Sequence, residues 1–408
     1  MPWTFCTTRV CRRLFPPQKT RPQVRWRNKG RQKTSHLTVN GSVAFERTIY
    51  WNQHAGAVAP LDELLGIVAE NYSPGVREMV CRLSLNEAFA PVSESLQRTA
   101  QLSVSRSAIR DLVEREGRRA EGAIRQGQYG PDWTAADCTA QTIITGADGV
   151  MVPAVTDEQK RRRRATEAGK RKKEGRSSTA KPGRPRRGSD GPYKEFKIAS
   201  FYDPDKSHKY AVGKRGDHRV LGRILRREGA KVKIGEAAHK YSVTDGAEWI
   251  GNQYGQQLPM LDENILDYYH LRDYVIRTSH VLYGEGTAKA RAWREDMMGL
   301  VWNQGSLVML DRLGHYLRRH RSGPKAAALR SLRQYVGNRV QMTDYPRYRQ
   351  MGYDCGSGPT ESFCGTLTKR LKGRGMRWDL DNAESIMALG SLYYSALWSD
   401  YWVRQAAA

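Results

Sequence analysis

Long apolar runs, paired cysteines and negative charge are all scarce in this sequence of 408 residues. The longest apolar candidate, Met387–Trp398, is short and contains glycine and serine, so nothing approaches the ~20 apolar residues of a membrane-spanning helix. The basic N-terminus is not followed by an apolar stretch of roughly 7–15 residues, which argues against a secretory signal. We therefore expect a soluble, cytoplasmic protein that does not contact a membrane.

The cysteines exclude two kinds of small domain. The six cysteines include no C-x-x-C pair, which argues against a zinc ribbon. In a chain of this length they do not suggest a disulfide framework either. Reduced thiols are the simplest account.

Acidic residues are outnumbered, with 42 Asp and Glu against 68 Lys and Arg, which gives a net charge of +26. Such an excess predicts a polyanionic partner. Nucleic acid is favoured over a membrane surface because no basic amphipathic helix with a broad apolar face stands out. A basic chain that is merely soluble remains the alternative. The length and the 10 Trp and 20 Tyr residues are sufficient for two or three folded domains.

The first part of the chain predicts a DNA-binding region. Residues 1–36 are rich in Arg, Lys and Pro and suggest a flexible basic arm that follows a phosphate backbone. Residues 37–125 then form an N-terminal region. It begins with a hairpin, because apolar and polar residues alternate around Asn40-Gly41, and continues with helices.

Two of these helices are separated by a short polar turn. The first is expected over residues 86–97, and the second begins after a cap at Ser103 or Ser105. The pair fits a helix-turn-helix, with Arg106, Ser107 and Arg110 facing outward to contact DNA. An ordinary helical hairpin is the alternative interpretation.

Further along, residues 159–192 contain 14 Lys and Arg, three acidic residues and almost nothing apolar. Such a stretch cannot bury a core, so we expect a disordered basic loop. Contact with DNA phosphates is the favoured role, and a targeting signal or a solvated charge run is the alternative.

The rest of the chain has the order of an α/β fold. Strand-like runs cover residues 141–150, 196–202, 209–212, 232–234 and 241–244, with a helix expected over 218–228. Helical patterns follow up to about residue 335. We therefore expect an α/β core over 138–270 and 356–400, interrupted by an α-helical insertion over 271–355.

Three acidic residues occupy unusual positions. Asp148 and Asp245 each follow a strand-like run and precede glycine, and Glu361 lies in the first turn of a helix that Pro359 helps to begin. Two strand ends facing a helix-borne glutamate would gather oxygen ligands of the kind that Mg²⁺ and Mn²⁺ prefer. Each acid taken alone is equally compatible with a turn or a helix cap.

Five blocks of sequence resemble the DDE transposases of bacterial insertion sequences, particularly the ISKra-type group. The blocks are A-D-G (147–149), T-D-G-A-x-W (244–249), L-D-Y-Y-H (266–270), G-P-T-E-S (358–362) and K-R-L-K-G-R-G-M-R-W (369–378). The resemblance covers roughly residues 37–400. It implies an RNase H-like catalytic core with a mixed sheet and an α-helical insertion. Relatives often carry a C-x-x-C-G element where this chain has residues 52–56, so an N-terminal zinc site is not expected.

The resemblance also implies a site and an activity. Asp148, Asp245 and Glu361 would be the catalytic triad that binds two Mg²⁺ or Mn²⁺ ions, with Asp267 and His270 in support. A metal-activated water would cleave double-stranded DNA at the element ends, and the freed 3′-OH would attack target DNA without a covalent protein intermediate. The resemblance further implies a dimer or higher oligomer on DNA, and a nucleoid-associated location in the cytoplasm.

The helix of Glu361 is expected to continue to Lys372, since Gly373 would end it. Its basic residues and those just beyond would form a positive ridge for the DNA backbone: Lys369, Arg370, Lys372, Arg374 and Arg377. Trp249 and Trp378 are candidates for base stacking, with core packing as the alternative.

Three other functions remain open. A tyrosine recombinase would use His315 and Arg318 with Tyr335 or Tyr345, and would form a covalent adduct with DNA. A catalytically decayed or regulatory protein would bind DNA without cutting it. A general nuclease of the same fold would cut without regard to end sequence.

Overall fold

The computed structural model describes residues 26–65, 71–175, 193–373 and 376–407. The chain forms two compact units, of which one comprises Met1–Glu116 with Trp398–Ala408 and the other Gly117–Leu397. The division at residue 116 falls inside the N-terminal region that we expected over residues 37–125. The residues after 397, predicted to end the core, belong to the first unit. Among the described helices, none has the length and apolar character to cross a membrane.

The first unit combines a three-stranded antiparallel sheet with helices. Its elements are β1 (Arg27–Thr38), β2 (Gly41–Asn52), β3 (Gly56–Val58), α2 (Pro60–Leu64), α3 (Pro74–Ser84), α4 (Phe89–Ala100), the first part of α5 (Arg106–Arg125) and α16 (Trp398–Ala407). Thr38 pairs with Gly41 across the turn, so the predicted hairpin is confirmed. Gly41 has a φ of 107°, which glycine adopts without steric cost.

Strand β1 is longer than the sequence predicted. Residues 27–36, which were expected to belong to the flexible arm, pair with β2 as far as Trp51. The long partner strand supplies backbone hydrogen bonds that satisfy the polar main chain of this basic stretch. Residues 1–25 of the predicted arm lie outside the described residues.

Helices α4 and α5 follow the predicted pattern of apolar and polar faces. Val92 and Leu96 of α4 and Ile109 and Leu112 of α5 are fully buried. The hydroxyl of Ser105 accepts a hydrogen bond from the Ala108 N–H at 3.2 Å and so caps α5.

The second unit is built on a five-stranded mixed sheet in the order β7-β6-β4-β8-β9. The strands are β4 (Thr142–Val152), β6 (Lys194–Tyr202), β7 (Lys209–Arg215), β8 (His239–Thr244) and β9 (Glu263–Leu266). The pairs β4–β6 and β6–β7 are antiparallel, whereas β4–β8 and β8–β9 are parallel. A separate parallel pair joins β5 (Ala154–Val155) to β10 (Trp378–Asp379). The predicted mixed sheet is therefore present.

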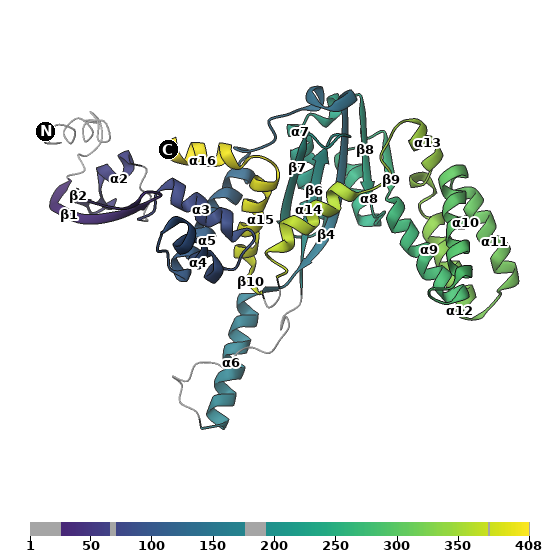
Figure 1. Cartoon of the computed structure of the whole chain (residues 1–408), viewed down its shortest axis with the longest axis horizontal. Coiled ribbons are helices and arrows are strands. Elements are labelled where there is room, and N and C mark those ends of the chain that lie inside the picture. The colour runs from purple at the N-terminus through teal and green to yellow at the C-terminus, as the bar shows by residue number, and fades with distance from the viewer. Residues whose placement is uncertain (1–25, 66–70, 176–192, 374–375, 408) are drawn as a thin grey trace. The chain divides into compact units, whose positions relative to one another are not determined.

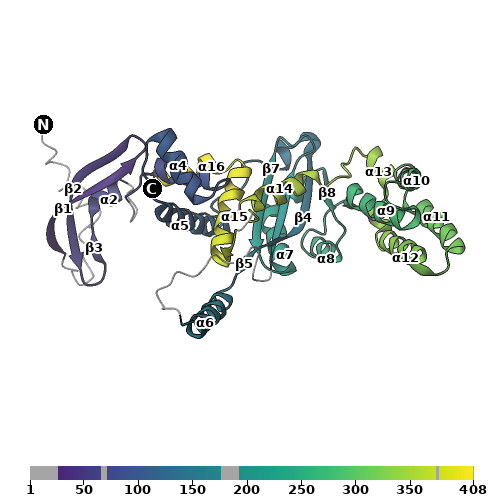
Figure 2. The ribbon, with the colours of Figure 1, turned by 60° about the horizontal axis from the view of Figure 1, so that its bottom comes forward.

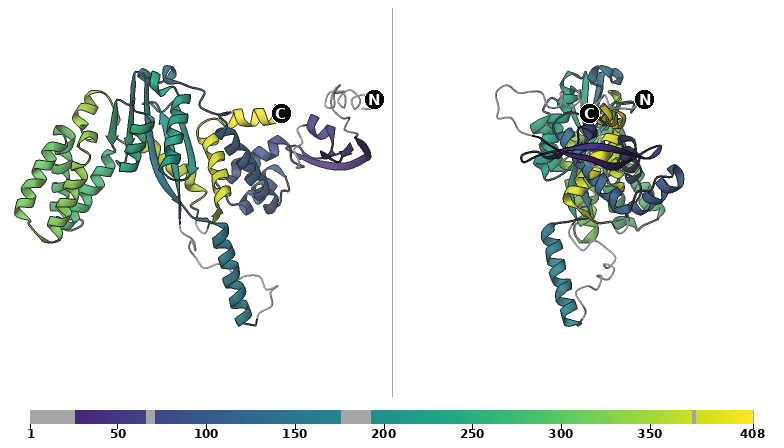
Figure 3. Two further views of the ribbon diagram at one scale, coloured as in Figure 1. Left: turned by 180° about the vertical axis from the view of Figure 1, so that it is seen from behind. Right: turned by 90° about the vertical axis from the view of Figure 1, so that its left-hand side faces the viewer.

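Helices cover both faces of this sheet, as Figures 1 and 3 show. Helices α14 (Gly358–Lys369) and α15 (Leu380–Tyr394) lie on one face, and α7 (His218–Lys231) and α8 (Glu248–Gln257) lie on the other. Residues 232–234, predicted to form a strand, instead end α7 and begin a short 3-10 helix. Lys233 there has a φ of 53°, a left-handed conformation that ends regular structure.

Five helices follow β9 along the chain and precede α14, and we call residues 268–350 the helical segment. Figure 2 shows these helices grouped together. They are α9 (Tyr268–Tyr283), α10 (Ala288–Gln304), α11 (Ser306–Arg319), α12 (Gly323–Gly337) and α13 (Tyr345–Gln350). Their buried residues, such as Val275 and Leu329, belong to one hydrophobic cluster with Ile144 and Tyr241 of the sheet. The helical segment therefore shares a continuous core with the sheet.

Part of the predicted basic loop is helical. Helix α6 (Asp157–Lys173) is capped by Thr156, whose side chain forms a capping box with Gln159. Acidic residues occupy its first turn and lysines and arginine its last, which matches the helix dipole. Pairs such as Arg162–Glu158, at 2.5 Å, add local support. The prediction of disorder was wrong for residues 159–173, because a polar sequence can form a helix without burying a core. Residues 176–192 lie outside the described residues.

Candidate active site

The first two predicted acids lie side by side at the same level of the sheet. In the parallel pair of β4 and β8, Thr145 is opposite Ser242. Asp148 and Asp245 each follow these partners by three residues, so the register places both at the same level, three residues beyond the last parallel pair of β4 and β8. The prediction that Asp148 ends its strand was wrong, because β4 continues to Val152 in antiparallel pairing with β6.

The environment of Asp148 is partly buried and negatively charged. Burial and the charge of Asp245 both raise the pKa of the Asp148 carboxyl. Hydrogen bonds from the Gly149 N–H, at 2.6 Å, and from the Cys364 thiol act in the opposite direction. The influence of Asp245 on this pKa shows that the two carboxylates are close enough to interact.

Asp245 is fixed by its own turn and by the helical segment. One of its carboxylate oxygens accepts a hydrogen bond from the Ala247 N–H at 2.8 Å. The hydroxyl of Tyr335 in α12 donates to the Asp245 carbonyl at 3.3 Å, and the Arg339 guanidinium donates to the Gly246 carbonyl at 2.9 Å. Nothing in the sequence pattern indicated Tyr335 and Arg339 as supports, because both contacts join residues about ninety positions apart.

The third acid, Glu361, comes to the sheet through close packing of α14 on β4. A Cβ atom placed on Gly146 would lie 1.9 Å from the Thr360 hydroxyl oxygen, so α14 can approach only because residue 146 is glycine. The Ser200 and Thr360 hydroxyls are 2.8 Å apart and join the same helix to β6. Cys364, one turn beyond Glu361, is hydrogen-bonded to Asp148, so the first turns of α14 lie beside that acid.

The Glu361 carboxylate itself lies nearer to the supporting residues than to the two aspartates. It accepts a hydrogen bond from the Ser357 hydroxyl at 3.2 Å and lies 3.5 Å from His270 Nε2. Ligand atoms of Asp267, His270 and Glu361 all lie within 4.8 Å of one another. Among the described residues, Asp148, Asp245 and Glu361 do not form a group of that kind.

Asp267 ties two helix starts together at this edge of the sheet. It follows β9 and is 1 % exposed. One of its carboxylate oxygens accepts from the His270 N–H at 2.8 Å and thereby caps α9, and the other accepts from the Ser357 N–H just before α14. The Tyr268 N–H donates to the Cys355 carbonyl at 2.8 Å. Asp267 therefore positions the turn that carries Glu361.

The residues at this edge fit a hard divalent cation in their chemistry. Asp148 and Asp245 offer carboxylate oxygens, and their mutual repulsion is what a bound cation would relieve. Glu361 is 57 % exposed, so its side chain can change rotamer without disturbing the core. His270, 42 % exposed, offers an imidazole nitrogen beside it.

The predicted positive ridge is only partly formed. Helix α14 ends at Lys369, so Lys372 lies in the following turn, although its N–H still donates to the Thr368 carbonyl. Both lysines are exposed. Arg370 is buried and lies over the Trp378 ring, 4.9 Å from its centroid, so it does not belong to the ridge. Arg377 is half-buried, and Arg374 lies outside the described residues.

The predicted DNA-contacting residues of the first unit are accessible. Arg106, Ser107 and Arg110 at the start of α5 are exposed. Arg110 also pairs with Asp111 at 2.6 Å, both more than half exposed. An exposed pair of this kind contributes little to stability, so Arg110 stays available to a phosphate.

A buried lysine near the site was not predicted from the sequence. Lys197 lies opposite Gly149 in the pairing of β4 with β6 and is 3 % exposed. Its ammonium group lies 2.6 Å from Glu195 and 3.5 Å from the centroid of the Trp249 ring. The lysine ammonium group therefore covers one face of the Trp249 ring, and Trp378 is buried. Both observations support packing roles for these rings rather than base stacking.

Comparisons with known proteins find similarity to a family model and to solved structures. A family model described as "Uncharacterised protein family (UPF0236)" matches residues 14–175, which include Asp148 but neither Asp245 nor Glu361. No curated protein matches the chain. Among solved structures, the chain is similar to the Drosophila P element transposase strand transfer complex, with 10% sequence identity and a TM-score of 0.36. That similarity covers 83% of this chain and 96% of the other.

Proposed function

We propose that this protein is a DDE transposase of the insertion-sequence type, built on an RNase H-like core. The observation that carries the proposal is the equal register of Asp148 and Asp245, each three residues beyond the last pair that joins the parallel strands β4 and β8, with the first turn of α14 packed beside them at Gly146. We infer that three carboxylates from remote parts of the chain act together at this end of the sheet, with the Glu361 side chain turning from Asp267 and His270 toward the two aspartates when cations bind. Their chemistry suits phosphodiester cleavage and strand transfer assisted by two divalent ions such as Mg²⁺.

Each acid has a distinct part in this proposal. Asp148 and Asp245 hold the cations and are oriented by the Gly149 and Ala247 N–H groups. Glu361 completes the ligand set from α14, and Asp267 positions its turn. When bound, the ions supply Lewis-acid activation of the attacking group and neutralise the leaving oxygen. The protein's own contribution is to align the DNA phosphate with these carboxylates.

Double-stranded DNA is the proposed partner of the exposed basic residues. Lys369 and Lys372 lie about two to three turns beyond Glu361 and neutralise phosphates of DNA that approaches the acids. Arg106, Ser107 and Arg110 contact the element ends through the helix-turn-helix. Two ends must be held at once, so we propose that at least two copies assemble on DNA.

The structure disfavours a tyrosine recombinase. Tyr335 and Tyr345 are buried and donate their hydroxyls to the Asp245 and Leu266 carbonyls. Burial also raises the pKa of Tyr335 to about 12. A nucleophilic tyrosine needs an accessible hydroxyl and a neighbouring base.

The test is metal-dependent cleavage of a labelled DNA fragment that contains the sequences flanking the protein's own coding region. We expect wild-type protein to nick this DNA in Mg²⁺, and Asp148→Asn, Asp245→Asn and Glu361→Gln to lose nicking while they still bind it. Glu236→Gln, which neutralises an exposed acid before the start of β8, is the matched control and should cut normally.

Three results would contradict the proposal. Cleavage by Asp148→Asn at the wild-type rate would remove the proposed role of the acids. A DNA adduct that follows the protein into phenol would favour a recombinase. Binding without cleavage by the wild-type protein would favour a regulatory or decayed protein.

A further inference from the structure

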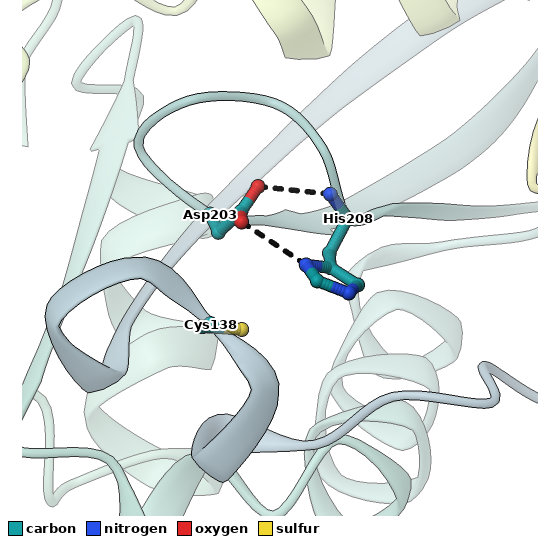
Figure 4. A group of neighbouring side chains, drawn as sticks. All are labelled: Cys138, Asp203 and His208. Atoms are coloured by element: carbon teal, nitrogen blue, oxygen red, sulfur yellow. Dashed lines mark hydrogen bonds and ion pairs between the residues drawn. The ribbon is translucent and has the colours of Figure 1, made fainter.

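A second group of ligand-type side chains lies at the end of the sheet away from Asp148. Cys138 precedes β4, Asp203 follows β6 and His208 precedes β7, so three chain segments meet here (Figure 4). The thiol sulfur, a carboxylate oxygen and an imidazole nitrogen lie within 4.8 Å of one another. Cys138 is 6 % exposed and Asp203 is fully buried, whereas His208 is 31 % exposed.

The buried carboxylate has little positive charge to balance it. Asp203 accepts hydrogen bonds from the His208 N–H at 3.0 Å and the Ser207 hydroxyl at 2.7 Å, both neutral donors. Its ion-pair partner among the described residues is the His208 ring, at 3.1 Å, which is charged only when protonated. A buried carboxylate is ordinarily paired with a permanent cation or bound to a metal ion.

Further negative charge surrounds the thiol. Burial first, and then the charges of Asp203, Asp137 and Asp205, raise the pKa of Cys138 to about 12. This acidic neighbourhood stands out in a chain of net charge +26, and its field attracts a small cation rather than a phosphate.

We propose that Cys138, Asp203 and His208 bind a divalent cation of the zinc type. Sulfur, nitrogen and oxygen ligands together are the set that zinc prefers over magnesium. Bond lengths of about 2.0–2.3 Å place two ligands of a tetrahedral zinc ion roughly 3.3–3.5 Å apart. His208 Nδ1 and the Asp203 oxygen are already 3.1 Å apart, so the ion takes the place of the proton between them.

Binding requires one proton to leave and one short movement. The Cys138 thiol, which now donates to the Thr134 carbonyl at 3.4 Å, loses its proton to solvent and binds as the thiolate. The single ring proton of neutral His208 moves from Nδ1 to Nε2 through solvent, so the net loss is the thiol proton alone. The sulfur moves inward by about 1 Å, and water fills the fourth position.

This site is independent of the proposed active site. It lies at the opposite end of β4 and contains sulfur, whereas the acids at the other end offer oxygen. An ion here would join the segment before β4 to the turn between β6 and β7. The expected role is therefore structural stabilisation of the sheet.

The experiment is a titration of the chelator-treated full-length protein with Co²⁺, a spectroscopic substitute for zinc. We expect one equivalent to give a thiolate-to-cobalt charge-transfer band, which added Zn²⁺ abolishes. Cys138→Ser should lose the band, and His208→Gln should bind Zn²⁺ at least about 100-fold more weakly. Zn²⁺ should also raise the melting temperature of the wild-type protein but not of His208→Gln.

Matched controls separate this site from the other thiols and acids. Cys364→Ser removes the thiol beside Asp148, and Asp148→Asn removes the proposed catalytic carboxylate; both should keep the cobalt band. Absence of the band in the wild-type protein would overturn the proposal. So would a band that survives Cys138→Ser or disappears in Cys364→Ser. Because His208 is partly exposed, His208→Gln provides a test even if Cys138→Ser does not fold.

Discussion

The contact between Gly146 and Thr360 controls how close Glu361 comes to Asp148, and it can be tested by Gly146→Ala. The added Cβ atom would lie 1.9 Å from the Thr360 hydroxyl oxygen, whereas ordinary contacts begin at 3.4 Å. The start of α14 must therefore retreat by about 1.5 Å, since neighbouring core atoms leave no free space. Overpacking of this kind typically costs about 1–3 kcal/mol.

The same retreat should lower the rate of DNA cleavage far more than the loss of stability alone would explain. A displacement of about 1 Å between catalytic groups can lower a rate by roughly 10²-fold. We therefore expect Gly146→Ala to remain folded at room temperature but to nick DNA about 10²-fold more slowly. Chemical denaturation measures the first effect and single-turnover cleavage the second. Gly358→Ala is the control, because a Cβ there meets nothing within 4 Å.

A second substitution should partly reverse the first. Thr360→Ala removes the hydroxyl and leaves the Thr360 Cβ as the nearest atom, at 2.9 Å. The required retreat then falls to about 0.5 Å, so the double variant should be more stable and more active than the sum of the single effects predicts. Cleavage by Gly146→Ala at the wild-type rate would refute the proposed packing of the site. Strict additivity of the effects of Gly146→Ala and Thr360→Ala would refute it as well.

Two further predictions concern buried charge, one in the second unit and one in the first. Asp148→Asn should be more stable than the wild-type protein at neutral pH in metal-free buffer. Because folding raises the pKa of the Asp148 carboxyl, the free energy of unfolding of the wild-type protein falls as pH rises from about 4 through the folded-state pKa. The difference in stability between the wild-type protein and Asp148→Asn should therefore disappear below about pH 4. Denaturation curves between pH 3 and 7 check this, and a constant difference would contradict it. In the first unit, the Arg77 and Glu116 side chains are 1% and 0% exposed and 2.8 Å apart. Arg77→Met alone should cost about 3–5 kcal/mol of unfolding free energy, and adding Glu116→Leu should recover most of the loss. Urea denaturation of the three variants decides this, and a double variant less stable than Arg77→Met would show the explanation to be wrong.

The features predicted well from the sequence are those with local causes. The turn at Asn40-Gly41 and the buried faces of α4 and α5 follow from residues that are neighbours in the chain. Strand β4 was also recognised from its apolar run. By contrast, the sequence of α6 contains no apolar face, and its helix depends on caps and charge pairs that a composition argument overlooks.

The sequence was enough to select the acids as candidates, with Asp267 and His270 as candidate supports, but not to predict the contacts that hold them in place. Asp148 and Asp245 stand out because each combines a strand-like run with a following glycine. The bond from Asp267 to the Ser357 N–H and the position of Lys197 against Trp249 depend on contacts between distant parts of the chain. The same is true of Cys138 and His208, which share no sequence pattern.

The two hydrogen bonds that join residues 267–268 to residues 355–357 have a consequence for how this chain can vary. They close the base of a long excursion of the chain, so its two ends stay together whatever lies between them. Closing a longer loop costs little additional entropy, only about 0.6 kcal/mol for each doubling of length. Residues gained or lost in the far turns, such as the one between α11 and α12, should therefore leave the spacing of the carboxylates unchanged. Related chains are free to diverge there, and an engineer can graft a new binding loop at that point.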